Sequence, residues 1–295
     1  MWQTVMEPFQ FAFLRHAIVV CTVAGALCGV LGVYVTLRGM SYLGHGLSHA
    51  IFGGAAICAA VGINFFVGAA VWGLASGLAV SRVTRRQIIG ADAAIGVITT
   101  ASFAFGIALL GIYTRVRQSI EATVFGSVLG VSLGDMWLII GVAIATVAVI
   151  IVCYRQLLFT TFDPEVADIF GVNSARMDAL LMLLLSSAIL SSMKVLGVTL
   201  IAAALVIPPV VARMLTSSFR RMLVLSGSIG GVAGFVGMYL SYHLDISSGS
   251  AIVLVNFAAF VVVYAITGSA GLQRAAAGAR QPVRERPLLT GVAAD

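Results

Sequence analysis

The amino-acid sequence predicts an all-α fold, a polytopic bundle of about eight or nine transmembrane helices. Hydrophobic residues make up 60% of the chain and charged residues only 9%, whereas about a quarter of the residues in a soluble domain are charged. The apolar runs have the length of membrane-spanning helices, about twenty residues, rather than that of barrel strands. The 32 glycines suit a bundle in which helix backbones approach closely.

Apolar windows divide the chain into nine candidate spans, in order 16–37, 41–62, 64–81, 92–112, 136–154, 178–193, 195–214, 222–243 and 249–268. The sixth is short and only Lys194 separates it from the seventh, so a count of eight is also possible. We expect residues 1–270 to form one transmembrane domain. The segment from Ser119 to Val131 is too short to span and is expected to be a surface or re-entrant helix.

The basic residues predict how the bundle is oriented. If the 155–177 loop and the C-terminal tail are cytoplasmic, all but four of the 17 basic residues lie inside, which satisfies the positive-inside rule. The four on the outside are Arg15, Arg115, Arg117 and Lys194. Nine spans then place the N-terminus outside. Residues 271–295 are rich in Arg, Gly and Pro, and we expect a disordered cytoplasmic tail.

The second candidate span carries the most informative residues, His45 and His49. Residues four apart share one helix face, so both imidazoles should point the same way. An ionisable pair inside a membrane is a candidate functional site, and two neutral imidazoles make half of a tetrahedral zinc site. His49 lies nine residues into the span, roughly 14 Å deep. The pair therefore predicts a divalent-metal site near the bilayer midplane.

The long loop between the fifth and sixth spans predicts a short surface helix within residues 160–172. Asp163 can cap a helix that begins at Pro164, and Gly171 can end it near Phe170. Glu165 and Asp168 extend its polar face, whereas its apolar side contains Val166, Ala167, Ile169 and Phe170. That apolar side either packs on its own bundle or docks an ATPase subunit. The ATPase would be a separate chain, because no phosphate-binding GxxxxGK[ST] loop occurs in the sequence.

Five other polar or helix-bending residues are secondary candidates. Asp92 opens the fourth span, where a carboxylate suits the helix dipole and could also bind metal. His243 and Asp245 end the eighth span and could form an outer access site or a simple hydrogen bond. Pro208 and Pro209 remove two backbone donors from the seventh span, so we expect a kink there and consider a gating hinge.

Several motifs together resemble the permeases of zinc, manganese and iron ABC importers. They are LRGMSYLGHGLSHA at 37–50, GADAAIG at 90–96, Asp163-Pro164-Glu165, LVIPP at 205–209 and LDISSG at 244–249. The resemblance implies a type II importer-like homodimeric permease in the plasma membrane, two cytoplasmic ATPase subunits and an extracytoplasmic metal-binding protein. It also implies metal ligands at positions 45 and 49, usually an aspartate and a histidine. His49 matches, whereas His45 replaces the carboxylate and favours zinc over manganese.

The expected function is therefore a permease subunit, not an enzyme, for ATP-driven import of Zn²⁺ or Mn²⁺ by alternating access. No tightly bound cofactor is expected. The main alternative is an ATP-independent secondary transporter or channel with the histidines as a proton relay, although intramembrane carboxylates are scarce. A membrane metalloenzyme would need a general base and a further ligand, and no HExxH motif is present. A siderophore or cobalamin permease has no clear use for the pair.

Overall fold

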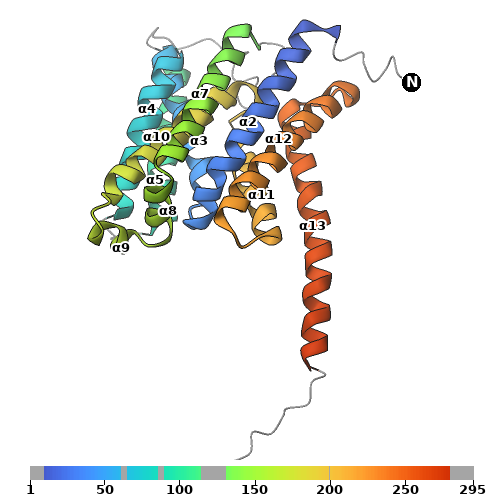
Figure 1. The fold of residues 1–295 in the computed structure, drawn as a ribbon. Helices are drawn as coiled ribbons and strands as arrows, with labels where there is room; N and C mark the ends of the chain where they lie inside the picture. Colours follow the sequence, from blue (N-terminus) through green and yellow to red (C-terminus); the bar gives the residue numbers. More distant parts are fainter. Residues whose placement is uncertain (1–9, 61–64, 86–89, 114–130, 199, 280–295) are drawn as a thin grey trace, which may run out of the picture.

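The computed structural model describes residues 10–60, 65–85, 90–113, 131–198 and 200–279, and every regular element in these ranges is a helix (Figure 1). The helices are, in chain order, α2 (Ala12–Leu37), α3 (Leu43–Ala60), α4 (Phe65–Arg85), α5 (Ala91–Tyr113), α7 (Leu133–Val152), α8 (Tyr154–Phe162), α9 (Pro164–Ile169), α10 (Ser174–Leu196), α11 (Ile201–Leu215), α12 (Phe219–Leu244) and α13 (Ser248–Ala279). The all-α prediction is confirmed.

Each candidate span corresponds to one long helix. Seven of the described helices are long and apolar enough to cross a membrane: α2, α4, α5, α7, α10, α12 and α13. Of the other two helices that correspond to candidate spans, α3 and α11, the latter is a shorter apolar helix. The short helix expected at 119–131 lies almost entirely outside the described residues. Figure 1 shows α13 reaching beyond the rest of the bundle. It continues to Ala279, so the start of the stretch expected to be a disordered tail is helical.

The boundary between the sixth and seventh spans differs from the prediction. α10 runs through Lys194 to Leu196 and ends at Gly197, whose φ of 76° is left-handed. Glycine adopts that conformation without the steric cost of a Cβ, so the glycine and not the charge ends the helix. The carbonyls around the break are satisfied by neighbouring helices: Ser248 Oγ donates to Val195 O at 3.0 Å and Ser48 Oγ to Val198 O at 2.8 Å. Such partners are required where no water is available.

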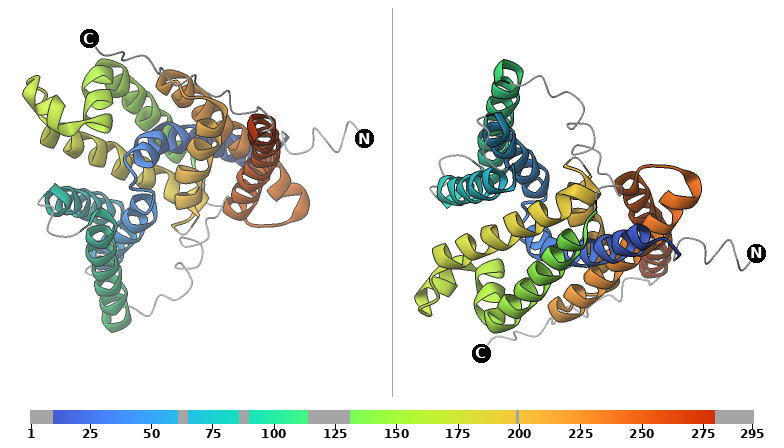
Figure 2. Two further views of the ribbon diagram at one scale, coloured as in Figure 1. Left: turned by 90° about the horizontal axis from the view of Figure 1, so that it is seen from below. Right: turned by 90° about the horizontal axis from the view of Figure 1, so that it is seen from above.

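Viewed along the bundle, α3, α4 and α5 form a group beside a larger group that contains α2 and α10 to α13 (Figure 2). Within the larger group α2 and α12 pack backbone to backbone. A Cβ on Gly25 would lie 2.1 Å from Gly230 O, and Ser226 Oγ donates to Gly29 O across the seam at 2.6 Å. Small residues allow this approach, which is how membrane helices associate without hydrophobic driving force.

The smaller group keeps α3 and α5 parallel, with α4 as the return. Gly46 lies against Thr99 and Gly53 lies against Gly106, so positions along both helices rise together. α4 connects this group to α10, where Ser186 Oγ donates to Gly73 O at 3.3 Å. The parallel register brings the middle of α5 beside the histidines of α3.

Pro208 and Pro209 are both buried inside α11, and the helix continues through them to Leu215. The seventh span is therefore not broken there. Without a proline N–H, position 209 cannot bond the Leu205 carbonyl. That carbonyl lies instead against Gly32 of α2, where a Cβ would come within 1.8 Å of it. The two prolines thus shape the contact between α11 and α2. A role for them as a gating hinge stays a prediction.

Candidate metal site and coupling segment

His45 and His49 lie one turn apart on α3 with their side chains together. Their ring centroids are 4.4 Å apart and their Nε2 atoms 3.2 Å apart. Two nitrogens bound to one tetrahedral zinc ion at 2.0–2.1 Å would be about 3.3–3.4 Å apart. The spacing of the pair is thus close to that of two ligands on a single ion. In the absence of an ion, the N–H of one ring can donate a hydrogen bond to the bare nitrogen of the other.

The position of the pair is fixed from both sides of α3. Ser48, which lies between the two histidines in the sequence, is fully buried. Its hydroxyl lies 2.8 Å from both the His45 and Val198 carbonyl oxygens. The ring of Phe103 on α5 packs edge-on against His49, with centroids 4.9 Å apart. Tyr42 approaches His45 at 5.5 Å. These contacts restrict both imidazoles to a narrow range of orientations.

A cavity of about 200 Å³ opens beside the pair. It is lined by Tyr42, His45, Gly46, His49, Thr99, Thr100 and Phe103. The Nδ1 atom of His49 is buried and has no hydrogen-bond partner, an unsatisfied state that is costly in a low-dielectric surrounding. Within the part of the chain that the structure describes, no cluster of three or more metal-ligating side chains occurs. Among the described residues, the cavity therefore presents two imidazole side chains, which is half the number of ligands in a tetrahedral site.

The structure does not bring Asp92 into this cavity. Asp92 is exposed in the first turn of α5, seven residues before Thr99. That separation corresponds to about 10 Å along the helix. Its position suits the helix dipole, and a direct role in binding the ion stays a prediction.

His243 and Asp245 lie at the opposite end of the bundle from the pair. Leu205 contacts both Gly32, in the C-terminal half of α2, and Gly44, the residue before His45. His45 and His49 therefore lie near the C-terminal half of α2. Tyr242, beside His243, instead approaches Phe11 at the start of α2, with ring centroids 6.4 Å apart. His243 is exposed and packs against the Tyr239 ring at 4.5 Å. Asp245 has a left-handed φ of 52° and caps α12. An access role for these residues also stays a prediction.

The surface helix expected after the fifth span is present as α9, with Phe170 as its C-cap. Asp163 Oδ1 accepts a bond from Val166 N at 3.0 Å, Pro164 takes the first helical position, and Gly171 has a φ of 78°. Its apolar side is covered only in part. Ala167 is fully buried against the bundle, whereas Ile169 and Phe170 are 81% and 75% exposed.

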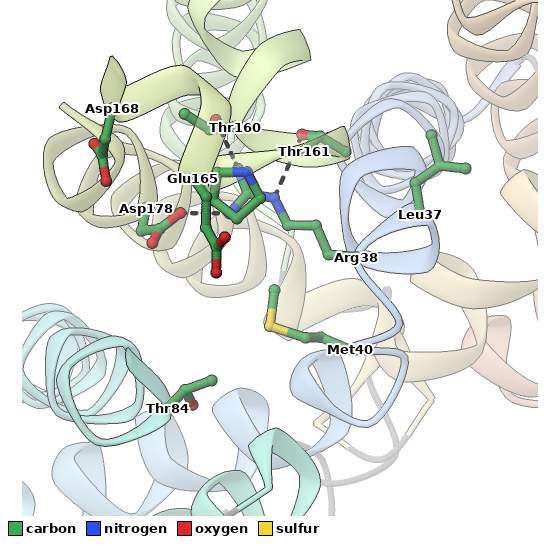
Figure 3. Close-up of a pocket in the computed structure, with 10 residues that line it drawn as sticks. Leu37, Arg38, Met40, Thr84, Thr160, Thr161, Glu165, Asp168 and Asp178 are labelled. Carbon is green, nitrogen blue, oxygen red and sulfur yellow. Dashed lines mark hydrogen bonds and ion pairs between the residues drawn. The ribbon is translucent and has the colours of Figure 1, made fainter. Parts of the chain in front are cut away.

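A charged cluster beside α9 was not found by sequence reasoning (Figure 3). Arg38, which belongs to the 37–50 motif but was not predicted to make a contact, forms an ion pair with Asp178 at 2.6 Å. Its other guanidinium nitrogens approach the hydroxyls of Thr160 and Thr161 at 3.1 and 3.4 Å. A cavity of about 470 Å³ adjoins them, lined by Leu37, Arg38, Met40, Thr84, Thr160, Thr161, Pro164, Glu165, Asp168 and Asp178. An acidic residue near the start of an apolar span was the available signal.

The apolar helices of spanning length indicate a multi-pass membrane protein, and a histidine pair beside a cavity suits a permease. The chain belongs to the ABC 3 transport family, whose pattern matches residues 10–267. Two relatives are the "Manganese transport system membrane protein MntC" of Listeria monocytogenes, 35% identical over 89% of this chain and 94% of that protein, and the "Chelated iron transport system membrane protein YfeD" of Yersinia pestis, 30% identical over 89% and 88%.

A solved structure is also similar over nearly the full length. The structure described as PsaBC from Streptococcus pneumoniae in complex with Fab aligns with a TM-score of 0.80 and 32% identity, covering 90% of this chain and 95% of that chain. The resemblance to metal ABC importer permeases is thereby confirmed. The chain is the membrane subunit of a metal ABC transporter, a transport component rather than a catalytic chain.

Proposed function

We propose that this chain is the permease subunit of an ATP-driven importer, and that His45 and His49 hold the transported divalent metal ion during its passage. The observation that carries this proposal is the 3.2 Å separation of the two Nε2 atoms. Packing by Phe103 and the buried Ser48 hydroxyl orients the rings before an ion arrives. The ion meets ligands already in place, so little ordering entropy is lost on binding.

Release of the ion follows from the incomplete ligand set. A closed tetrahedral site with four protein ligands would hold zinc too tightly for transport. Here one chain supplies two imidazoles, and the remaining ligands come from water or from a second copy of the chain across a dimer axis. Separating the two copies removes half of the ligands. Alternating access thus converts a high-affinity site into a low-affinity one.

The partners follow from the resemblance and from the exposed surface of α9. Ile169 and Phe170 project from α9 with 81% and 75% exposure, as expected for side chains that insert into a groove on a cytoplasmic ATPase subunit. The ATPase faces the same side as the C-terminal tail in the orientation that the basic residues favour. An extracytoplasmic metal-binding protein would deliver the ion at the opposite end of the bundle, where α12 ends.

Two metals have specific support. The imidazole of His45, where the family has a carboxylate, favours zinc, because nitrogen donors suit zinc and manganese prefers oxygen. Manganese is the second candidate, since the names of MntC and ScaB of Streptococcus parasanguinis, 36% identical over 87% of this chain and 91% of that protein, specify manganese transport. We place zinc first on the donor set.

The proposal is tested by uptake into vesicles that contain the chain together with its ATPase subunit. Wild-type protein should accumulate zinc only when ATP is supplied, and His49→Ala should abolish this accumulation. His16→Ala is a matched control, because His16 lies in α2 and does not line the cavity. Accumulation without ATP would instead favour a secondary transporter. Unchanged uptake in His49→Ala would remove the pair from the pathway.

A further inference from the structure

The short helix α9 is tied to the start of α10 by one buried serine. Ser174 is fully buried, and its hydroxyl lies 2.9 Å from Pro164 O and 2.8 Å from Asp168 Oδ1. The Ser174 N–H also donates to Asp168 Oδ1 at 2.9 Å. Because these bonds join both ends of α9 to the first turn of α10, the two helices should move as one body.

One turn further along α10, Asp178 continues the polar connection to Arg38. The ion pair measures 2.6 Å, and the side chains are only 8% and 18% exposed, so water and salt screen it weakly. Arg38 also donates to Thr160 Oγ1 on α8 at 3.1 Å. The planar guanidinium therefore clamps the ends of α8 and α10 at once, which a lysine could not do.

Arg38 lies at the turn that begins the metal-binding helix. It is the C-cap of α2, and Gly39 follows with a left-handed φ of 67°. The turn is tied by bonds from Met40 N to Val35 O at 3.0 Å and from Leu43 N to Met40 O at 2.8 Å. His45 is in the first turn of α3, so a short, hydrogen-bonded segment separates the guanidinium from the metal pair.

A cavity beside Arg38 separates α9 from the α2–α3 turn, and Arg38 reaches across from the turn to the α9 side. The cavity of about 470 Å³ is lined by Glu165 and Asp168 from α9, by Met40 from the α2–α3 turn and by Thr84 from α4. Figure 3 shows Arg38 reaching from the α2–α3 turn toward Asp178 and the two threonines, away from Thr84. A displacement of α9 can reach the α2–α3 turn through this arginine.

We propose that Arg38 is a positioning residue that transmits movement of α9 to the metal-binding histidines, with Asp178 as its obligatory partner. The inference rests on the proposed function, because it assumes that an ATPase moves α9 and that His45 and His49 hold the ion. Neither Arg38 nor Asp178 touches the ion. Their removal separates ATP hydrolysis from transport and leaves the metal pair itself unchanged.

The test uses the complete permease–ATPase complex in vesicles, with zinc uptake and ATP hydrolysis measured on the same samples. In Arg38→Met and Asp178→Asn we expect uptake to fall about tenfold, within the usual range of coupling between sites, while ATP hydrolysis stays within about twofold. The double variant should transport no less than either single variant, since both act through one connection. Arg176→Met, an exposed arginine on the same helix, should behave as wild type.

Arg38→Lys keeps the charge and loses the fork, so it should recover part of the uptake and keeps the test valid if Arg38→Met fails to assemble. Full uptake in Arg38→Met, or additive losses in the double variant, would overturn the inference. Uptake and hydrolysis that fall together in every variant, Arg38→Lys included, would also overturn it. A wild-type complex without ATP-dependent uptake would instead refute the proposed function, and the inference with it.

Discussion

The cavity beside His45 and His49 and the Arg38 cluster are built on opposite principles. The cavity has two imidazole rings, aromatic and threonine walls, and a buried His49 nitrogen without a partner. The Arg38 cluster has a full ion pair and two hydroxyl contacts around one guanidinium. A site that must release its ion gains from an incomplete ligand set. A connection that must transmit movement gains from several simultaneous bonds, because each one restricts the geometry.

The substitution with the largest expected effect changes the donor atoms that line the cavity. In His45→Asp a carboxylate replaces one imidazole, which should raise manganese uptake relative to zinc by about tenfold, because oxygen ligands suit manganese better. Competition between the two metals in the same vesicles measures the ratio. An unchanged ratio would show that position 45 does not choose the metal, and the contrast between an adaptable cavity and a fixed cluster would weaken.

A second prediction separates the exposed part of α9 from its buried part. Phe170→Asp should weaken binding of the ATPase subunit about fivefold, as expected when a large anchoring side chain is lost from an interface. The fold should be unaffected, because Phe170 is 75% exposed. Ile151→Ala, at a side chain that is 68% exposed on α7, is the control and should leave ATPase binding unchanged. Equal affinity in Phe170→Asp would argue that α9 packs only on its own bundle.

A smaller effect tests the bond between α9 and α10. Ser174→Ala removes a buried hydroxyl that contacts Pro164 and Asp168, which costs about 1 kcal/mol and loosens α9. We expect faster hydrogen exchange of the α9 amides and uptake reduced about twofold to fivefold, since opening of a local unit controls exchange. Ser187→Ala, which loses only a local bond to Leu184 O, is the matched control. Unchanged hydrogen exchange would show that the Ser174 hydroxyl does not hold α9 to α10, and so that α9 is not coupled to the Arg38 cluster in this way.

Much of the fold could be predicted because membrane spans and local caps are encoded locally. Apolar length identified the helices, and Asp163-Pro164 with Gly171 identified α9 to within a residue. The histidine pair followed from helical periodicity alone. The break at Gly197 was misplaced because a charge was weighted above a glycine. The Arg38–Asp178 pair joins residues 140 positions apart. The acidic residue near the start of an apolar span signals that Asp178 needs a partner, but only the packing of α2 against α10 identifies that partner as Arg38.

The measurement that tests the central claim most directly is X-ray absorption at the zinc edge of the zinc-loaded, full-length permease. Wild-type protein should show at least two imidazole nitrogens at about 2.0–2.1 Å from the zinc ion. That imidazole signal should disappear in the His45→Ala/His49→Ala double variant, while His243→Ala should retain it. An identical spectrum in wild type and the double variant would contradict the account, because the ion would then be bound elsewhere.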